Sequence, residues 1–477
     1  MICRASVALA ALAIPALAGA QTAAPKPAAP SPASILPVPP PPAPLPQVSE
    51  KQAAELVAWL GQGTAEGIGV TEADRARYAK LRGDGLVRAA LDRARALRTG
   101  RIEQQDYLSI WALRPAAYDP LPSFTTAVQS DRLAAWIADL TPPYAGYDGL
   151  KKGLATYQAI RAQGGWPALT KASKPEAIRA RILVEDPEAS GTLVDILQRT
   201  QRRYGLRPTG TLDADTLAAL NVPVRDRIAA IEANLERWRW LPRELPTHRV
   251  QVNIAAAVLT VFEGDKPVAS MRAVTGRPGN ETPMLQSQIH SIVVNPPWNV
   301  PSSIATKELW PQGRAALLAK GYKIIGDGKN ARLQQPPGPG NSLGRLKFDF
   351  DNPFAVYLHD TPARGKFSAY DRLASHGCVR LEKPVPLAQL MLKTDPKWDG
   401  DAVEQAIAAG KTQRVALPEK VAVYLLYWTA FANANGTLGF RDDPYGWDKL
   451  LAGKIAASGR KAETSTQVAL LGKEGQK

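Results

Sequence analysis

Residues 354–381 read FAVYLHDTPARGKFSAYDRLASHGCVRL, a strand-like run, a loop and a second apolar run behind a tight turn. The first run ends at His359, and the turn places His376 two residues before Cys378. A cysteine attacks carbonyl carbon as the thiolate, and a free thiol is mostly protonated at neutral pH. Cys378 therefore needs a base within hydrogen-bond reach, and His359 and His376 are the histidines nearest to it in the sequence.

The residues around Cys378 suit acyl transfer. Gly377 permits a tight turn, so that the amides of Gly377 and Cys378 can converge on a developing oxyanion. Arg380 could grip a substrate carboxylate through its planar guanidinium. A zinc site of His359, His376 and Cys378 is a rival interpretation, but His-x-Cys is a poor match to zinc spacing and no fourth ligand is near. We expect no metal and no cofactor, and an inert buried thiol remains the alternative.

The sequence around this stretch predicts a β-rich domain over residues 247–415. Val250, Val252 and Ile254 alternate with polar residues, and Gly264 follows an apolar run as in a hairpin. Further strand-like runs cover residues 258–262, 268–274, 289–294 and 354–359. A Pro- and Gly-rich insertion at about 296–344 is long enough to form a lid over an active site.

Residues 49–185 are predicted to form a helical scaffold domain. Ser49 can cap one helix, and Thr71 with Asp74 can open another. Apolar residues recur at helical spacing, and no motif in this region suggests chemistry. The fold class is therefore multidomain α+β, with a helical part before the β-rich part.

A compact helical unit is predicted between the scaffold and the β-rich domain, at residues 186–224. Its sequence LQRTQRRYGLRPTGTLDADTLAALN places a helix before Gly205 and a second helix after the capping residue Asp213. This unit resembles the small peptidoglycan-binding module of wall enzymes, and a structural helical hairpin is the alternative. A connecting helix is predicted at 225–246.

The two ends of the chain read differently from its middle. Residues 1–20 suit a secretory signal peptide, and an uncleaved membrane anchor is the alternative. Residues 21–48 are a Pro/Ala-rich linker. A C-terminal extension is expected at 416–455 to pack on the scaffold or the catalytic domain, and residues 456–477 are expected to be disordered.

Composition and charge indicate where the protein acts and which partners suit it. The chain has 477 residues, two cysteines and a formal net charge of +15. Removal of a signal would take Cys3 with it, leaving Cys378 as an unpaired thiol in an exported protein. The basic charge suits an anionic wall polymer or membrane surface, and export disfavours nucleic acid as a partner.

Residues 354–381 resemble the active-site signature of the L,D-transpeptidase (YkuD) family, a histidine followed at a distance by Ser-His-Gly-Cys. Three further segments resemble the YcbB-like branch, which carries a wall-binding module and a lid: VVNPPWNVPSSIA from 293, GPGNSLGRLKF from 338, and YWTAFANANGTLGFRDDPYGWD from 427. The resemblance implies a YkuD-type β-sandwich for the catalytic domain.

The resemblance also implies roles for single residues. Cys378 would be the nucleophile, His359 the general base and the carbonyl of Asp360 its orienting group. The amides of His376, Gly377 and Cys378 would bind the oxyanion. The substrate-binding residues would be Arg380, Ser375, Trp298 and Asn341.

The implied reaction cross-links peptidoglycan stem peptides through a cysteine thioester, with release of D-alanine and sensitivity to carbapenems. Peptidoglycan peptides and glycan strands would be the partners, in the periplasm of a Gram-negative-type envelope. A wall-peptide cysteine hydrolase and a non-catalytic wall-binding scaffold remain alternatives. Lipoprotein attachment and D-amino acid exchange also remain open, as does the oligomeric state.

Overall fold

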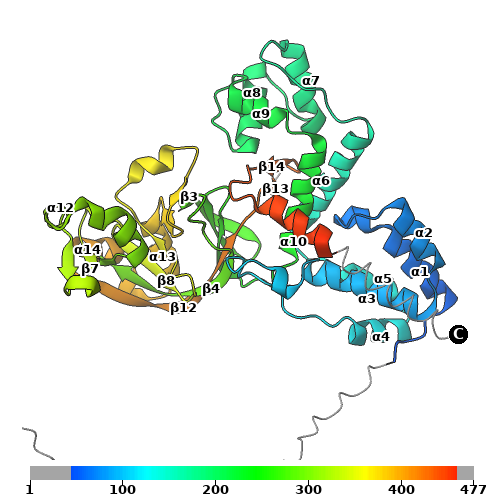
Figure 1. Ribbon diagram of the computed structural model, residues 1–477, viewed down its shortest axis with the longest axis horizontal. Coiled ribbons are helices and arrows are strands. Elements are labelled where there is room, and N and C mark those ends of the chain that lie inside the picture. The colour runs from blue at the N-terminus through cyan, green and yellow to red at the C-terminus, as the bar shows by residue number, and fades with distance from the viewer. Residues whose placement is uncertain (1–43, 434, 459–477) are drawn as a thin grey trace, which may run out of the picture. The chain divides into compact units, whose positions relative to one another are not determined.

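The computed structural model describes residues 44–433 and 435–458 (Figure 1). The signal peptide predicted at 1–20 lies outside the described residues. Most of the linker predicted at 21–48 and most of the tail predicted at 456–477 lie outside them as well. These three assignments stay predictions.

The folded part extends slightly beyond both predicted edges. Leu45 and Val48 pack against the first helical core, ahead of the expected start at Ser49. Residues 447–458 are helical, so the tail boundary predicted at 456 falls inside a helix. The N-terminal edge is earlier than predicted because Leu45 and Val48 pack on the core, and the C-terminal edge is later because the helix continues.

The region before residue 186 is helical, as predicted. Its α-helices are α1 (Glu50–Gly61), α2 (Glu72–Lys80), α3 (Gly83–Thr99), α4 (Leu121–Gln129), α5 (Leu133–Asp139), α6 (Ala145–Ala162) and α7 (Pro175–Glu185). Ser49 caps α1 and Thr71 caps α2, each in a reciprocal capping box. Leu56, Leu86 and Phe124 are completely buried in the core that α1, α3 and α4 share.

The helical unit expected at 186–224 is also present. It consists of α8 (Leu193–Tyr204) and α9 (Ala214–Leu220). Gly205 ends α8 with a φ of 73°, and the Asp213 side chain accepts a hydrogen bond from the amide of Thr216 at the start of α9. Helix α10 (Val224–Trp238) follows and ends before the predicted limit at 246.

The catalytic region is built on one sheet. Its strands are β1 (His248–Asn253), β2 (Val258–Glu263), β3 (Lys266–Gly276), β4 (Leu285–Val294), β8 (Leu346–Phe350), β9 (Leu358–His359), β10 (Leu373–Ser375), β11 (Val379–Leu381) and β12 (Gln413–Leu426). Within the described residues the order is β10-β3-β11-β9-β8-β4-β12-β1-β2, and β2 also pairs with β3. That extra pairing closes the sheet on itself, with β10 attached outside the ring on β3.

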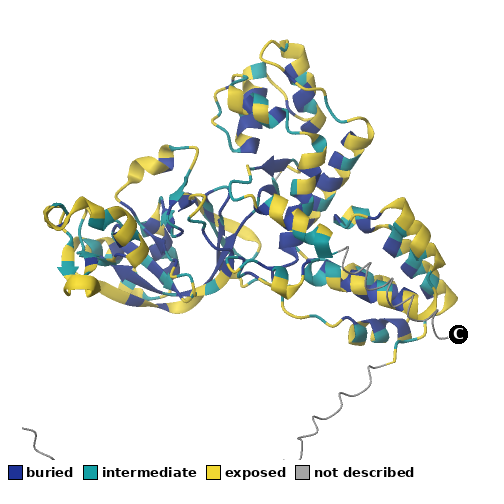
Figure 2. Cartoon of the chain, in the orientation of Figure 1, coloured by how far each residue is buried: buried dark blue, intermediate teal, exposed yellow. Residues whose placement is uncertain are grey.

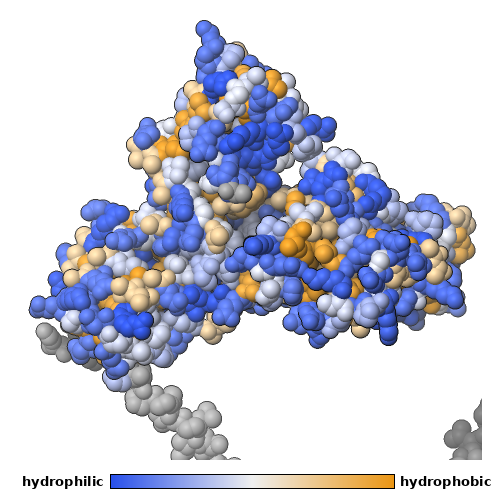
Figure 3. Space-filling view, turned by 180° about the vertical axis from the view of Figure 1, so that it is seen from behind, coloured by the Kyte–Doolittle hydropathy of each residue, from blue (hydrophilic) through white to orange (hydrophobic). Residues whose placement is uncertain are grey.

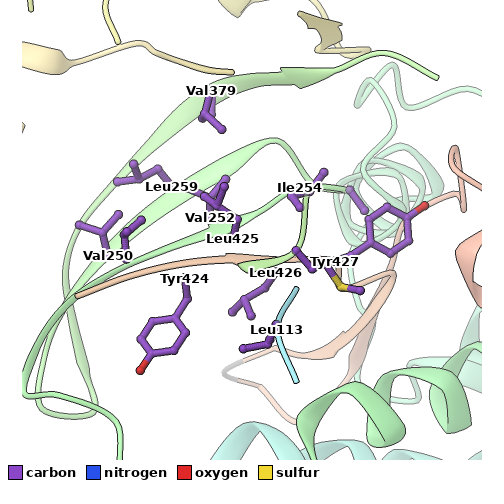
Figure 4. Packing of buried hydrophobic residues seen from close by; sticks show 14 of the residues in the cluster. Leu113, Val250, Val252, Ile254, Leu259, Val379, Tyr424, Leu425, Leu426 and Tyr427 are labelled. Atoms are coloured by element: carbon purple, nitrogen blue, oxygen red, sulfur yellow. The ribbon is translucent and has the colours of Figure 1, made fainter. Parts of the chain in front are cut away.

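The inside of the ring is apolar because side chains alternate along each strand. Val250, Val252, Leu259, Leu358 and Val379 are all completely buried. Figure 4 shows several of these side chains converging on one another from neighbouring strands. In Figure 2 the strands of this region are mostly coloured as buried, and the helices and loops around them are more exposed. Helix α13 (Pro384–Leu392) packs against β12.

The strand predicted at 354–359 is shorter than expected, since β9 contains only Leu358 and His359. Asn352 explains the difference, because its side-chain oxygen accepts the amides of Phe354 and Val356. Those amides are then unavailable to a sheet ladder, and Ala355 has a φ of 53° that no strand tolerates.

The domain boundary predicted at 415 is wrong. Strand β12 runs parallel to β1 and antiparallel to β4, so the sheet is incomplete without residues up to Leu426. The extension expected at 416–455 therefore begins after this strand. The alternation in RVALPEKVAVYLL is weak because Pro418 interrupts it and the register shifts between Ala416 and Val421.

The insertion at 296–344 folds around a small core of its own. Its elements are β5 (Trp298–Asn299), α11 (Ser302–Ile304), a π-helix (Ala305–Leu309), α12 (Arg314–Ala319), β6 (Lys323–Ile325) and β7 (Arg332–Gln335). The three strands form a separate sheet in the order β5-β7-β6. Val300, Ala305, Leu317 and Leu333 are buried together. The insertion is thus a subdomain, which we call the lid subdomain.

The C-terminal extension packs on the helical part of the chain. Strands β13 (Ala430–Ala432) and β14 (Leu438–Phe440) contact α6, α8 and α10. Trp428 stacks on Trp238 of α10, with ring centres 4.6 Å apart. Arg237 of α10 forms an ion pair with Asp448 at 2.6 Å.

The surface is mainly polar. In Figure 3, hydrophilic side chains cover most of the visible face, and hydrophobic groups are scattered between them. Among the described residues, none of the helices combines the length and the apolar character that a membrane crossing requires.

Candidate active site

Strands β9 and β11 bring the predicted nucleophile and base to one side of the sheet. The two strands are parallel, with Leu358 opposite Val379 and His359 opposite Arg380. Leu358 and Val379 point into the core, so His359 and Arg380 point to the outer face. Cys378 lies one residue before β11 (Val379–Leu381), and it hydrogen-bonds the side chain of Tyr357, which lies two residues before His359. The structure therefore places His359 and Cys378 on one face of neighbouring strands.

His359 is held in the tautomer that a general base needs. Its Nδ1 lies 2.5 Å from the carbonyl oxygen of Asp360. A carbonyl oxygen only accepts hydrogen bonds, so Nδ1 carries the proton and Nε2 is left as the proton acceptor. The side chain is 5% exposed. Burial lowers the pKa of His359 to about 3, assisted by the positive charge of Arg380 and opposed by the carbonyls of Asp360 and Leu343.

Cys378 is a free, half-buried thiol. Burial raises its pKa, because the thiolate loses solvation. Hydrogen bonds from the backbone and side chain of Tyr357, and the charges of Lys347 and Arg380, act in the opposite direction. Since the pKa of His359 is low and that of Cys378 is raised, the resting site holds a neutral imidazole and a neutral thiol.

Tyr357 and Lys347 belong to the site although the sequence analysis did not identify them. Lys347 lies opposite His359 in the β8–β9 register. Its Nζ is 4.3 Å from the centre of the Tyr357 ring and 2.6 Å from Asp349 Oδ1. Tyr357 could have been found, since it lies two residues before His359 and alternation gives both the same face. Lys347 required knowledge of the strand pairing.

The turn that carries Cys378 is braced from within. Ser375 Oγ donates to the carbonyl of Cys378 at 2.6 Å and accepts the amide of Gly377 at 3.1 Å. The Gly377 amide is therefore engaged and does not point to an oxyanion, contrary to prediction. In the described part of the chain the amides of His376 and Cys378 have no protein acceptor. Ser375 is 2% exposed and acts as a brace instead of the predicted substrate contact.

The His376 side chain points toward the lid subdomain. Its Nε2 lies 2.6 Å from Glu308 Oε1 in the π-helix of the lid subdomain. Arg277, just after β3, lies 3.3 Å from the same ring nitrogen and 3.4 Å from Glu308. The hydrogen bond with His376 lowers the pKa of Glu308. These three residues, which we call the lid contact, connect the catalytic turn to the insertion.

Arg380 is positioned to meet an anion. It has no ion pair with any described carboxylate, and its Nε is buried without a hydrogen-bond partner. Burial lowers the pKa of Arg380, but a guanidinium stays charged at neutral pH. A partly buried charge without a partner is unfavourable, which favours a substrate carboxylate as its counter-ion.

The two predicted substrate residues of the lid subdomain differ in placement. Trp298 hydrogen-bonds the side chain of Tyr357 and so lies next to the site. Asn341 is 1% exposed, and its Nδ2 donates to the carbonyls of Pro296, Gln335 and Pro336. Asn341 thus holds the two ends of the insertion together, and its contact with substrate stays a prediction.

Asp360 contributes its main chain to the site, as the resemblance implies. Its carboxylate faces away from His359, since Oδ2 accepts the amide of Arg345 at 2.8 Å and Oδ1 lies 3.2 Å from Arg364. The side chain therefore fixes the loop that presents the carbonyl. Within the described residues no three His, Cys, Asp or Glu side chains gather as a metal site.

Comparison with known families identifies two regions of the chain. Residues 247–403 match the L,D-transpeptidase catalytic domain (YkuD). Residues 49–154 match a family described as a scaffold domain. The first match starts at the predicted edge of the catalytic domain and contains Cys378 and His359.

Individual proteins are similar to parts of this chain. A Haemophilus influenzae protein that is provisionally named an L,D-transpeptidase is 31% identical over 220 residues, which cover 42% of this chain and 44% of the relative. The chain thus spans under half of that curated relative's length. Among solved structures, an L,D-transpeptidase from Mycobacterium smegmatis shares 15% identity with a TM-score of 0.21, covering 38% of this chain and 58% of that one.

L,D-transpeptidase 3 from Mycobacterium tuberculosis, solved with a faropenem-derived adduct, also shares 15% identity. Its TM-score is 0.20, and the match covers 38% of this chain and 60% of that one. The geometry of the Cys378 site and the family match cover the same part of the chain. Residues 247–403 of this chain are therefore similar to the L,D-transpeptidase catalytic domain (YkuD), and residues 49–154 are similar to the scaffold domain.

Proposed function

We propose that this protein is a peptidoglycan L,D-transpeptidase that cross-links stem peptides through a thioester on Cys378. One observation carries the proposal: parallel pairing of β9 and β11 puts His359 and Cys378 on the same face, with the His359 tautomer fixed by the Asp360 carbonyl. A nucleophile, a base and an orienting group in this order are what acyl transfer by a cysteine requires.

In the first half-reaction, Cys378 Sγ attacks the carbonyl carbon between the third residue and the terminal D-alanine of a donor tetrapeptide. The thiol proton passes to His359 Nε2 as the S–C bond forms. The amides of His376 and Cys378 stabilise the oxyanion. When the C–N bond breaks, the imidazolium returns this proton to the departing D-alanine amine, leaving a thioester.

In the second half-reaction, the side-chain amine of a third residue on a neighbouring stem attacks the thioester. His359 takes a proton from this amine and gives it to the sulfur as the C–S bond breaks. The new amide replaces the old one, so the exchange needs no ATP. Water competes with the amine, and Trp298 beside Tyr357 supports a shielding role for the lid subdomain.

The low pKa of His359 and the raised pKa of Cys378 support concerted proton transfer during attack in place of a preformed ion pair. Arg380, which has no counter-ion among the residues that the structure describes, is our candidate to bind a carboxylate of the donor stem. Lys347 adds a second positive charge on the same face and favours the thiolate as it develops.

We propose the cell wall outside the inner membrane as the place of action. The helical unit at 186–224 would bind peptidoglycan strands, and a formal charge of +15 suits an anionic polymer. Detection of the mature protein in the periplasmic fraction, with residues 1–20 absent by mass spectrometry, would support this; retention of the full chain in the membrane would indicate an uncleaved anchor.

Covalent labelling tests the proposal directly. The purified protein should gain the mass of one imipenem molecule, and the Cys378→Ala protein should gain none while keeping its thermal unfolding transition. No adduct on a wild-type protein with a reduced thiol would contradict the assignment. Muropeptide analysis after incubation with tetrapeptide substrate then separates transfer from hydrolysis, because dimers indicate cross-linking and free tripeptides indicate a hydrolase.

A further inference from the structure

We propose that Thr282 is a positioning residue for the oxyanion site, and that two segments outside the catalytic domain hold it in place. The segments are residues 110–113 of the scaffold domain and Tyr445 of the C-terminal extension. The inference rests on the proposed function of Cys378 and adds a structural role for the scaffold in acyl transfer.

Thr282 fixes the peptide plane that presents the Cys378 amide. Its Oγ1 donates to the carbonyl of Gly377 at 2.8 Å and accepts the amide of Gly276 at 2.9 Å, and the residue is completely buried. A trans peptide is planar, so its N–H points opposite to its carbonyl. By holding the Gly377 carbonyl, Thr282 directs the Cys378 N–H to the other side of the turn, where the oxyanion forms.

The loop that carries Thr282 packs tightly under the catalytic turn. Gly377 has a φ of 110°, and a Cβ added to it would lie 3.3 Å from the carbonyl oxygen of Glu281. A Cβ added to Gly276 would lie 2.1 Å from the carbonyl oxygen of Asn280. The two glycines allow this close approach, so a shift of the loop by even a small distance would move the turn.

The scaffold domain holds the far end of this loop through the main chain. Met284 donates its amide to the carbonyl of Ile110 at 3.0 Å. The carbonyl of Met284 accepts the amides of Ala112 and Leu113 at 2.8 and 3.0 Å. Leu113 is buried in the same hydrophobic cluster as Leu426 of β12 (Figure 4). The 110–113 segment thus joins the catalytic sheet two residues after Thr282.

Tyr445 of the C-terminal extension holds the part of this loop that carries Thr282. Its hydroxyl donates to the carbonyl of Gly276 at 2.5 Å and accepts the amide of Thr282 at 3.3 Å. The ring stacks on Tyr427, with centres 5.2 Å apart. The rings of Trp447 and of Trp111 in the scaffold domain have centres 5.8 Å apart. The C-terminal extension and the 110–113 segment therefore also contact each other.

Acylation kinetics with imipenem in the full-length protein test this role. The Thr282→Val protein keeps the side-chain shape and loses the hydroxyl. We expect its first-order acylation rate at saturating imipenem to fall by about 10- to 100-fold, as expected for a misplaced oxyanion donor. The non-covalent binding constant of imipenem should stay within about 2-fold, because ground-state contacts are retained.

The Thr282→Ser protein is the matched control, since it restores the hydroxyl and removes only a methyl group. Its acylation rate should stay near the wild-type value. Equal losses in the Val and Ser proteins, or a wild-type rate in the Val protein, would overturn the inference. If the Val protein does not fold, Tyr445→Phe decides: slower acylation with unchanged imipenem binding supports the role, and a wild-type rate rejects it. Failure of the wild-type protein to be acylated would instead reject the proposed function.

Discussion

At the scale of single residues, His359 and Cys378 are both uncharged near neutral pH, because burial shifts their pKa values in opposite directions. The free site therefore keeps its sulfur in the less reactive thiol form, and the proton moves only when a carbonyl is in place. Lys347 and Arg380 favour the thiolate without donating to it. The positive charges of Lys347 and Arg380 on the outer face thus lower the pKa of Cys378 without a hydrogen bond to it.

Alkylation measures this tuning. The rate at which iodoacetamide modifies Cys378 should rise with pH, with its midpoint above the ordinary value for a thiol and no inflection near pH 6.5. The Lys347→Met protein should show a midpoint at still higher pH, because a stabilising positive charge is removed. Asp349 keeps Arg414 as a partner at 2.9 Å in this variant. A Lys393→Met protein, altered far from Cys378, serves as control, and a common profile for all three proteins would contradict the tuning role.

His359 also makes stability depend on pH. Its pKa is 6.5 in an unfolded chain and about 3 when folded. Between these values the unfolded state binds a proton that the folded state does not, so stability decreases as pH falls from 6.5 toward 3. The full slope for one group is about 1.4 kcal/mol per pH unit. Urea unfolding from pH 7 to 4 should give a shallower decrease for His359→Gln than for wild type; parallel curves would show that His359 is not the cause.

At the scale of elements, alternation was sufficient to predict the strands that line the core, because Val250 and Val252 need no partner to reveal a buried face. The limits of the strands depended on side chains elsewhere. Asn352 takes the amides that a longer β9 would use, and β12 is recognisable only from its place between β1 and β4. Sequence periodicity reports the face of a strand and carries little information on its pairing.

The candidate site was predictable to the same degree. His359 and Cys378 were placed by the motif, and the Asp360 carbonyl by resemblance. Ser375 and Asn341 were predicted to bind substrate. Their hydrogen bonds to backbone groups of the turn and the insertion, which only the folded chain reveals, show that they are structural.

The lid contact gives a prediction for the insertion. Replacing Glu308 with Gln removes the charge that faces His376 and Arg277, so the π-helix at Ala305–Leu309 should exchange its amide hydrogens faster. Hydrogen–deuterium exchange with mass spectrometry can measure this. The Lys307→Gln protein changes an exposed neighbour on the same helix and should exchange at the wild-type rate. Equal exchange in the Glu308→Gln protein and wild type would show that the lid contact does not hold the insertion.

At the scale of the whole chain, helix α10 and the C-terminal extension are connected by buried polar contacts as well as by apolar packing. Arg237 of α10 pairs with Asp448, which also accepts a hydrogen bond from Thr429 at 2.6 Å. Asn234 donates to the same Thr429 hydroxyl at 2.7 Å. Separating Arg237 from Asp448 would leave buried charge without its partner, so this pairing favours one way for the C-terminal extension to pack.

Loss of this pairing should be severe. The Asp448→Ala protein leaves the Arg237 guanidinium buried without its counter-ion, and we expect the free energy of unfolding to fall by about 3–5 kcal/mol. The matched control is Asp226→Ala, which breaks an exposed pair with Arg225 and should change stability by about 0.5 kcal/mol or less. Urea unfolding measures both. Similar small losses would mean that Asp448 does not hold the extension.

The position of β12 in the ring has a consequence for biosynthesis. This strand is the last of the ring to be translated, and it fills the gap between β1 and β4. Until residue 426 has left the ribosome, both neighbours present an unpaired edge, which is a common starting point for aggregation. A nascent chain truncated before this strand should therefore depend on chaperones, whereas one that has passed it can close its barrel unaided.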